Sequence, residues 1–232
     1  SIVLGGTQLE ITDDLTVTGP GAAQLTIDAN RQSRAFLVDS QVVASISDMT
    51  IANGKTLVDV ASGGGGAGIR NQGDLTLTDV TFTGHEAFHR GGAVVNTYSV
   101  GLVIRHCVFT NNTATHGGGA VAAWDTVLIE DSVFESNTAV GDLTTQGGAI
   151  QNFGVATIER SVFRNNEADS HGGAIYGELN ANIIIEDSLI ADNRVVASDG
   201  AGGGLALRGS SDQVINSTIS SNASAGVGGG IW

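Results

Sequence analysis

Short runs of alternating apolar and polar residues recur along the whole chain. Two clear examples are "DLTLTDVTF" at 74–82 and "NIIIED" at 182–187, which are rich in β-branched and aliphatic residues. Alternation over four to eight residues predicts β-strands. No stretch of ten or more residues has the 3.6-residue period of an amphipathic helix. The pattern therefore predicts an all-β protein built from short strands.

The strand pattern repeats in register with fixed residue types. Each unit has a phenylalanine or isoleucine mark, and successive marks are 31, 27, 25, 29, 27 and 29 residues apart by subtraction: Ile51, Phe82, Phe109, Phe134, Phe163, Ile190 and Ile219. An asparagine follows three positions after each of the last five marks: Asn112, Asn137, Asn166, Asn193 and Asn222. A glycine pair recurs in phase at Gly91–Gly92, Gly118–Gly119, Gly147–Gly148 and Gly172–Gly173.

A unit of about 27 residues with two or three strands and glycine turns is typical of one coil of a parallel β-helix. We therefore expect a single right-handed parallel β-helix (a β-solenoid) of about eight coils, stacked roughly 4.8 Å apart. Residues 1–62 are less regular and are expected to form the first coils. Residues 63–232 are expected to form the regular coils of the same domain.

Stacking assigns a role to each repeated residue. The phenylalanines are expected to lie above one another inside the coil. The asparagines are expected to form an inward amide ladder at a turn, and to adopt the left-handed conformation of a sharp corner. The glycine pairs supply positive φ and let neighbouring coils approach closely. Small residues two positions before each mark (Cys107, Ser132, Ser161, Ser188 and Ser217) form another column, with hydroxyls paired along it.

Charged residues also form columns in this register. Asp131, Arg160 and Asp187 would stack as acid, base and acid, and Arg105 precedes Glu130, Glu159 and Glu186 in the adjacent column. Opposite charges on neighbouring strands stabilise a sheet. The column is expected to be a solvated face in which Arg105 and Arg160 lean across to the glutamates. A bound calcium ion is the alternative.

Composition and charge exclude several classes of function and partner. The 232 residues include 34 glycines and one proline, and 10 Lys plus Arg against 24 Asp plus Glu give a net charge of −14. Such a chain repels phosphate backbones, so nucleic acid is not expected as a partner. No segment has the roughly 20 apolar residues of a membrane helix. The single cysteine, Cys107, is expected to be a small buried side chain without an internal disulfide.

The pairing of GGA[IV] with FxxN resembles the repeats of the chlamydial polymorphic membrane proteins and related bacterial β-helix surface proteins. The paired segments are Gly91–Val94 with Phe109–Asn112, Gly118–Val121 with Phe134–Asn137, and Gly147–Ile150 with Phe163–Asn166; in a fourth pair, Gly172–Ile175 is followed by Ile190–Asn193. The resemblance covers about residues 63–232. It implies an exported protein whose passenger domain acts in adhesion, with the export signal outside this sequence.

An enzyme acting on polysaccharides is the rival interpretation, because other parallel β-helices have this activity. Glycosidases need two carboxylates about 5–10 Å apart, and Asp131 and Asp187 would lie roughly that far apart across two coils. The chain lacks the NTD, GHG and RIK motifs of pectin-cleaving β-helices. An enzyme should instead show carboxylates in a cleft walled by loops 54–65, 85–90 and 195–202, with Trp124 or Tyr98 beside it. We assign no catalytic residue.

A group of basic and imidazole side chains precedes the glycine pairs. His89, Arg90, His116 and His171 lie one or two residues before them, so the coils would place these residues near one edge. This group is a candidate ligand patch, to which Gln146 would add an amide. The alternative is that the histidines simply flank tight turns. Their spacing across coils is too irregular to predict a metal site.

Together these observations predict a non-catalytic extracellular module of a bacterial surface protein, adhesin-like or structural, with no cofactor. The expected partner is a protein or glycan on a host or neighbouring cell, without direct membrane insertion. Because a coil stack leaves unpaired backbone at its ends, we also expect either a longer parent protein or end-to-end self-association.

Overall fold

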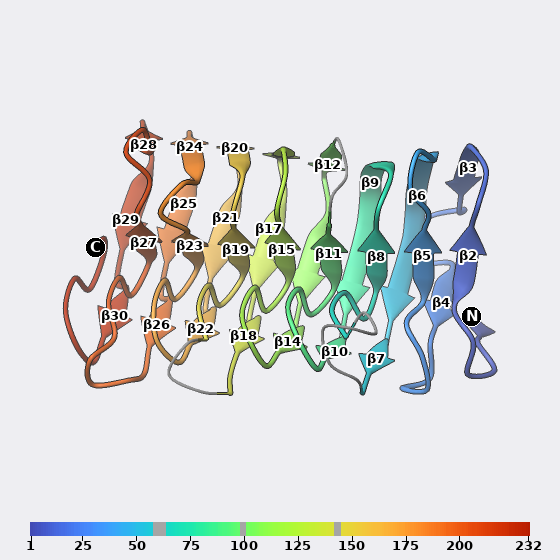
Figure 1. Cartoon of the computed structure of the whole chain (residues 1–232), viewed down its shortest axis with the longest axis horizontal. Coiled ribbons are helices and arrows are strands. Elements are labelled where there is room, and N and C mark those ends of the chain that lie inside the picture. The colour runs from blue at the N-terminus through green and yellow to red at the C-terminus, as the bar shows by residue number, and fades with distance from the viewer. Residues whose placement is uncertain (58–63, 98–100, 142–144) are drawn as a thin grey trace.

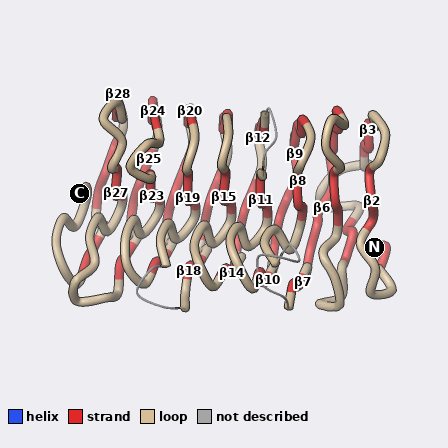
Figure 2. The backbone as a smooth tube through the Cα atoms, in the orientation of Figure 1, coloured by secondary structure: helices blue, strands red, loops and turns tan. Residues whose placement is uncertain are grey.

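The computed structural model describes residues 1–57, 64–97, 101–141 and 145–232. Its strands lie in three rows that follow the long axis of the molecule, and the coils succeed one another from the N-terminus to the C-terminus (Figure 1). The three parallel sheets have fifteen, eight and seven strands in the described part of the chain. No helix occurs in these ranges (Figure 2). The predicted all-β parallel β-helix of about eight coils is confirmed.

In the described part of the chain, every coil after the first contributes strands to all three sheets, and the first coil contributes none to the seven-stranded sheet. The fifteen-stranded sheet contains β1(Ile2–Val3), β3(Leu15–Thr18), β4(Thr26–Asp28), β6(Val43–Ala52), β9(Asp74–Thr83), β12(Leu102–Arg105), β13(Val108–Thr110), β16(Val127–Glu130), β17(Val133–Glu135), β20(Val155–Glu159), β21(Val162–Arg164), β24(Asn182–Glu186), β25(Leu189–Ala191), β28(Gln213–Ile215) and β29(Thr218–Ser220). The eight-stranded sheet contains β2(Leu9–Ile11), β5(Phe36–Val38), β8(Ile69–Asn71), β11(Val94–Asn96), β15(Val121–Ala123), β19(Ile150–Asn152), β23(Ile175–Gly177) and β27(Leu205–Leu207). The seven-stranded sheet contains β7(Lys55–Thr56), β10(Glu86–Ala87), β14(Thr113–Ala114), β18(Thr138–Ala139), β22(Glu167–Ala168), β26(Arg194–Val195) and β30(Ala223–Ser224).

The phenylalanines form a continuous stack in the core, as the spacing predicts. The ring centroids of Phe82 and Phe109 are 4.8 Å apart, those of Phe109 and Phe134 4.6 Å, and those of Phe134 and Phe163 4.7 Å. The planes of each pair differ by 6° or less. All four rings have no solvent exposure. The distances equal the spacing of neighbouring strands, so each coil places its ring directly on the previous one.

The asparagines form the expected inward ladder. The amide nitrogen of Asn112 donates to Oδ1 of Asn137 across 2.9 Å, and the amide nitrogen of Asn137 donates to Oδ1 of Asn166 across 3.0 Å. The same nitrogen of Asn137 also donates to the carbonyl oxygen of Phe109 in the preceding coil. Each amide therefore joins three successive coils. The ladder satisfies backbone groups that would otherwise be buried without partners.

The left-handed conformation lies on a different residue from the one expected. The ladder asparagines do not have positive φ. The residue before each of them does: Asn111, Ser136, Asn165, Asp192 and Ser221 have φ between 55° and 57°. The left-handed residue turns the chain and points outward. The next side chain, the ladder amide, is then directed inward to bond the backbone of neighbouring coils.

The two glycines of each pair have different functions. Gly147 has φ 71°, which L side chains rarely adopt. Gly148 has an ordinary φ, but a Cβ there would lie 2.1 Å from the carbonyl oxygen of Gly173 in the next coil. The first glycine therefore makes the turn and the second allows close contact between coils. Both parts of the sequence-based interpretation are confirmed.

The column of small residues is bonded to the backbone and not from hydroxyl to hydroxyl. The backbone N–H of Cys107 donates to Oγ of Ser132, and the N–H of Ser132 donates to Oγ of Ser161, each across 3.1 Å. The hydroxyl of Ser132 donates to the carbonyl oxygen of Glu130, two residues earlier. The column therefore supports the left-handed corner that includes Asp131, with φ 50°.

Candidate functional site

The outer surface of the eight-stranded sheet is covered by the turns that precede its strands. The middle residue of each short strand points away from the core, and in the five strands from β11 to β27 it is nevertheless buried: Val95, Ala122, Gln151, Tyr176 and Ala206. The turns before the strands pair in parallel from coil to coil through Arg90, Gly117, Gln146, His171 and Ala201. The turn residues and the strand residues together form one continuous outer layer.

Arg90 extends along this layer for two coils. Its Nε donates to Oε1 of Gln151 across 3.0 Å, and Nε2 of Gln151 donates to Oε1 of Gln146 across 3.2 Å. The coil between Arg90 and Gln151 contributes only Gly117 and Ala122 to the layer, and a Cβ on Gly117 would lie 2.3 Å from Gln151 Oε1. These two small residues leave the space in which Arg90 lies.

Two aromatic rings lie beside the guanidinium. The centroids of Trp124 and Phe153 are 4.5 Å apart and their planes differ by 5°. The Cζ of Arg90 is 5.8 Å from the Trp124 centroid and 5.4 Å from the Phe153 centroid. A cation on the outer face of one ring would lie a full stacking distance farther from the other ring. Nearly equal distances therefore place the guanidinium at the side of the pair.

His89 and His116 lie next to Arg90, as the interpretation as a ligand patch requires. Their ring centroids are 4.6 Å apart. Nη1 of Arg90 lies 3.2 Å from Nε2 of His89. Because the guanidinium can only donate, this imidazole nitrogen accepts and is unprotonated. Nδ1 of His116 lies 2.9 Å from the hydroxyl of Thr115.

His171 belongs to a second group, two coils beyond the turn of His116. Its ring lies 6.2 Å from that of Tyr176, and its Nδ1 lies 2.8 Å from the hydroxyl of Ser170. Nη1 of Arg208 donates to the hydroxyl oxygen of Tyr176 across 3.0 Å. Burial, followed by the charge of Arg208, lowers the pKa of His171. Burial of Arg90 likewise lowers the pKa of its guanidinium.

The acidic columns lie on another face, where arginines pair with Glu130, Asp131 and Glu159. Nη2 of Arg160 donates to Glu130 across 2.9 Å, its Nη1 to Glu159 across 2.6 Å, and its Nε to Asp131 across 3.1 Å. Hydrogen bonds from Arg105 and then Arg160 hold the pKa of Glu130 below its usual value. The described residues include no group of three or more His, Cys, Asp or Glu side chains placed to hold a metal ion.

The structure does not place the expected catalytic features together. Asp131 is bonded by Arg160, and Asp187 accepts a hydrogen bond from Asn216. Trp124 lies beside Arg90 of loop 85–90, but Asp131 and Asp187 lie on the corners of the fifteen-stranded sheet and not beside this ring. Loop 54–65 is described only in part, and Tyr98 lies outside the described residues.

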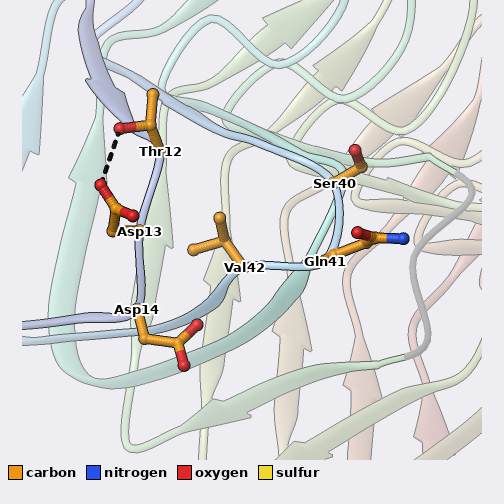
Figure 3. Close-up of a pocket in the computed structure, with 6 residues that line it drawn as sticks. All are labelled: Thr12, Asp13, Asp14, Ser40, Gln41 and Val42. Atoms are coloured by element: carbon orange, nitrogen blue, oxygen red, sulfur yellow. Dashed lines mark hydrogen bonds between the residues drawn. The ribbon is translucent and has the colours of Figure 1, made fainter.

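A polar hollow lies instead against the first coils. Thr12, Asp13, Asp14, Ser40, Gln41 and Val42 line it (Figure 3). Asp13 accepts a hydrogen bond from Thr12, and the Asp14 carboxylate accepts one from the backbone N–H of Val43 across 2.8 Å. The Asp14 bond fixes the corner between neighbouring coils. Both carboxylates are therefore accounted for by local structure.

The comparison with known proteins agrees with the repeat geometry. Three segments, residues 106–123, 131–152 and 160–178, match the Chlamydia polymorphic membrane protein repeat. These segments are polymorphic membrane protein repeats. Each runs from the left-handed corner residue through the phenylalanine, the ladder asparagine and the glycine pair to the next strand of the eight-stranded sheet. No curated protein and no solved structure matches the chain.

The repeat is characteristic of bacterial surface proteins that contain a β-helix, and it is not an enzyme signature. The described part of the chain has no helix long and apolar enough to cross a membrane.

Sequence reasoning missed several residues around Arg90. Gln151, Phe153, Tyr176 and Arg208 are not part of the repeat pattern, so their spacing gave no signal. They could have been found by aligning the outward positions of consecutive coils. That alignment shows that the eight-stranded sheet has varied side chains where the inward positions are uniform.

Proposed function

We propose that this chain is a non-catalytic, extracellular binding module of a bacterial surface protein, adhesin-like in function. The observation that carries the proposal is that inward and outward residues have different roles: the inward residues stack the coils, and the outward residues vary from coil to coil. The repeat residues, which match a bacterial surface-protein repeat, are used in stacking the coils. Side chains that differ from coil to coil lie on the outer layer of the eight-stranded sheet.

Such a division suits recognition. A rigid coil stack holds outer side chains at fixed spacing, which lowers the entropic cost of ordering them on binding. The proposed partner is a protein or glycan on a host or neighbouring cell. The proposal also includes a purely structural role, in which the module acts as a scaffold and binds no ligand. Neither role requires a cofactor.

Adhesion can be measured with beads. Beads coated with the folded chain should attach to epithelial cells in greater numbers than beads coated with heat-unfolded chain or with albumin. Equal attachment of all three would contradict the adhesin-like function.

The rival enzymatic function is tested with the same preparation. The chain should release no reducing ends from a panel of neutral and acidic polysaccharides over a day. Steady release that is lost on unfolding the protein would replace the proposal with a polysaccharide-acting enzyme.

A further inference from the structure

The cations of this acidic chain are distributed unevenly over its three sheets. Six of them form ion pairs on or beside the fifteen- and seven-stranded sheets: Arg31, Lys55, Arg105, Arg160, Arg164 and Arg194. Arg34 donates to the carbonyl oxygens of Gly65 and Gly66, and within the described residues Arg70, Arg90 and Arg208 form no ion pair. All three lie along the eight-stranded sheet: on β8, before β11 and after β27.

This separation is unexpected in a chain with 24 acidic and 10 basic residues. Exposed cations in such a chain readily find a carboxylate, as the other two sheets show. A half-buried guanidinium without one has a desolvation cost that neutral hydrogen-bond partners offset only in part. Arg90 is in this situation, because its bonds are to the neutral side chains of Gln151 and His89.

Arg90 and Arg208 extend toward each other along the coil axis. Arg90 reaches forward over two coils to Gln151, and Arg208 reaches back one coil to Tyr176. Gln151 and Tyr176 are directly paired on neighbouring strands, so the two arginines converge on adjacent coils. Among the described residues, the Glu178 carboxylate acts on both guanidinium groups through its charge but forms an ion pair with neither.

The groups between the arginines suit hydroxylated ligands. Gln146 offers an amide and His116 an imidazole, both partly exposed on turns, while the buried Tyr176 holds Arg208 through its hydroxyl. The partly exposed Trp124 and Phe153 rings add an apolar surface beside Arg90. Amides, aromatic rings and a guanidinium match the hydroxyls, C–H groups and carboxylate of an acidic sugar.

We propose that the Arg90–Arg208 face, defined by Arg90, Trp124, Gln146, Gln151, Phe153 and Arg208, binds a glycan that bears carboxylates. The inference rests on the proposed function, for which it names the ligand class. The guanidinium of Arg90 makes charge-assisted hydrogen bonds to one sugar carboxylate. The net charge of −14 favours a glycan with one carboxylate on every second sugar over phosphorylated or heavily sulfated glycans, in which the charge density is higher.

The test is isothermal titration calorimetry with a hyaluronan hexasaccharide, which has one carboxylate on every second sugar. The folded chain should bind it, and its carboxyl methyl ester should bind about tenfold more weakly because the charged acceptors are lost. Arg90→Gln and Arg208→Gln should each weaken binding by about tenfold. Arg164→Gln is the matched control, since Arg164 is paired with Glu135 on another sheet, and its affinity should stay within about twofold.

Folding of each variant is checked by circular dichroism. A Trp232→Phe variant keeps Trp124 as the sole tryptophan, and its fluorescence should change on adding the hexasaccharide.

Absence of binding, equal binding of the ester, or an equal loss in Arg164→Gln would overturn the proposal. Binding of a polyglutamate peptide without binding of the hexasaccharide would also overturn it, and would indicate an acidic protein partner. If bead adhesion persists in Arg90→Gln, the glycan site is wrong and the adhesin-like function stands; if wild-type beads do not adhere, that function fails independently.

Discussion

The backbone N–H of Gly54 donates a hydrogen bond to Nδ1 of His85 across 2.9 Å, and Nε2 of the same ring lies 3.0 Å from the carbonyl oxygen of Ile51. Since Nδ1 accepts, Nε2 has the proton and donates to Ile51. His85 follows Phe82 by three positions, which is the ladder position of the asparagines. A fully buried, neutral imidazole therefore replaces an amide at the N-terminal end of the ladder.

Replacing His85 tests this equivalence. His85→Ala leaves the Gly54 N–H and the Ile51 carbonyl without partners and should lower the free energy of unfolding by about 2–4 kcal/mol. His85→Asn can restore both bonds and should lose about 1 kcal/mol or less. Urea unfolding measures both. His106→Asn, at an exposed corner, is the control and should change stability by less than about 0.5 kcal/mol; a loss in His85→Ala no larger than this would contradict the assigned role.

The same imidazole should make stability depend on pH. Burial lowers the pKa of His85 to about 4, below its usual value of about 6.5. A depressed histidine pKa means that the unfolded state binds the proton first. Its contribution is therefore complete above about pH 6.5 and is lost as pH falls toward about 4.

The expected loss between about pH 7 and about pH 4.5 is roughly 2–3 kcal/mol. Because carboxylates also titrate there, the measured quantity is the difference between wild type and His85→Asn in urea unfolding at both pH values. An unchanged difference would show that His85 is not a buried neutral group.

Two adjacent types of corner residue should respond differently to mutation. Asn137→Ala removes a buried amide that bonds Asn112, Phe109 and Asn166, and should cost about 3 kcal/mol or more. Asn165→Gly keeps a left-handed corner and should change stability by about 0.5 kcal/mol at most. Thermal unfolding of the two variants provides the comparison. Equal effects would mean that the ladder and the corner are not separate functions.

Cys107 should be unreactive in the folded protein. Burial raises the pKa of its thiol to about 12, so very little thiolate exists at neutral pH. Iodoacetamide should label the folded chain far more slowly than the urea-unfolded chain, as followed by mass spectrometry. Since Cys107 is the only cysteine, labelling reports this site alone. Rapid labelling without denaturant would place the thiol at the surface.

The fold could be predicted from sequence because its stabilising contacts repeat. Phe109 meets Phe134 only if the coils are in register, and the constant offset from phenylalanine to asparagine fixes that register. The left-handed residue was harder to assign. Asn111 and Asn112 are adjacent and identical in type, and only the coordinates show which one turns the chain and which one points inward.

The candidate site was less predictable because it does not repeat. His89, Arg90 and His116 were found through their position before the glycine pairs, and the structure brings them together. Gln151 and Arg208 reach the same layer through long side chains that cross coil boundaries. The spacing of residues along the chain does not show which neighbouring coil a long side chain will contact. The role of His85 could have been predicted from its position three residues after Phe82, where later coils have the ladder asparagine. It was missed because the residue is a histidine and not an asparagine.

The stacking of successive coils is the claim on which the whole account depends. Nuclear Overhauser spectroscopy on a sample with protonated phenylalanine rings in a deuterated chain tests it directly. The account predicts ring-to-ring contacts between Phe82 and Phe109, between Phe109 and Phe134, and between Phe134 and Phe163, with no contact between Phe82 and Phe163. Absence of the neighbouring contacts, or a contact between Phe82 and Phe163, would contradict it.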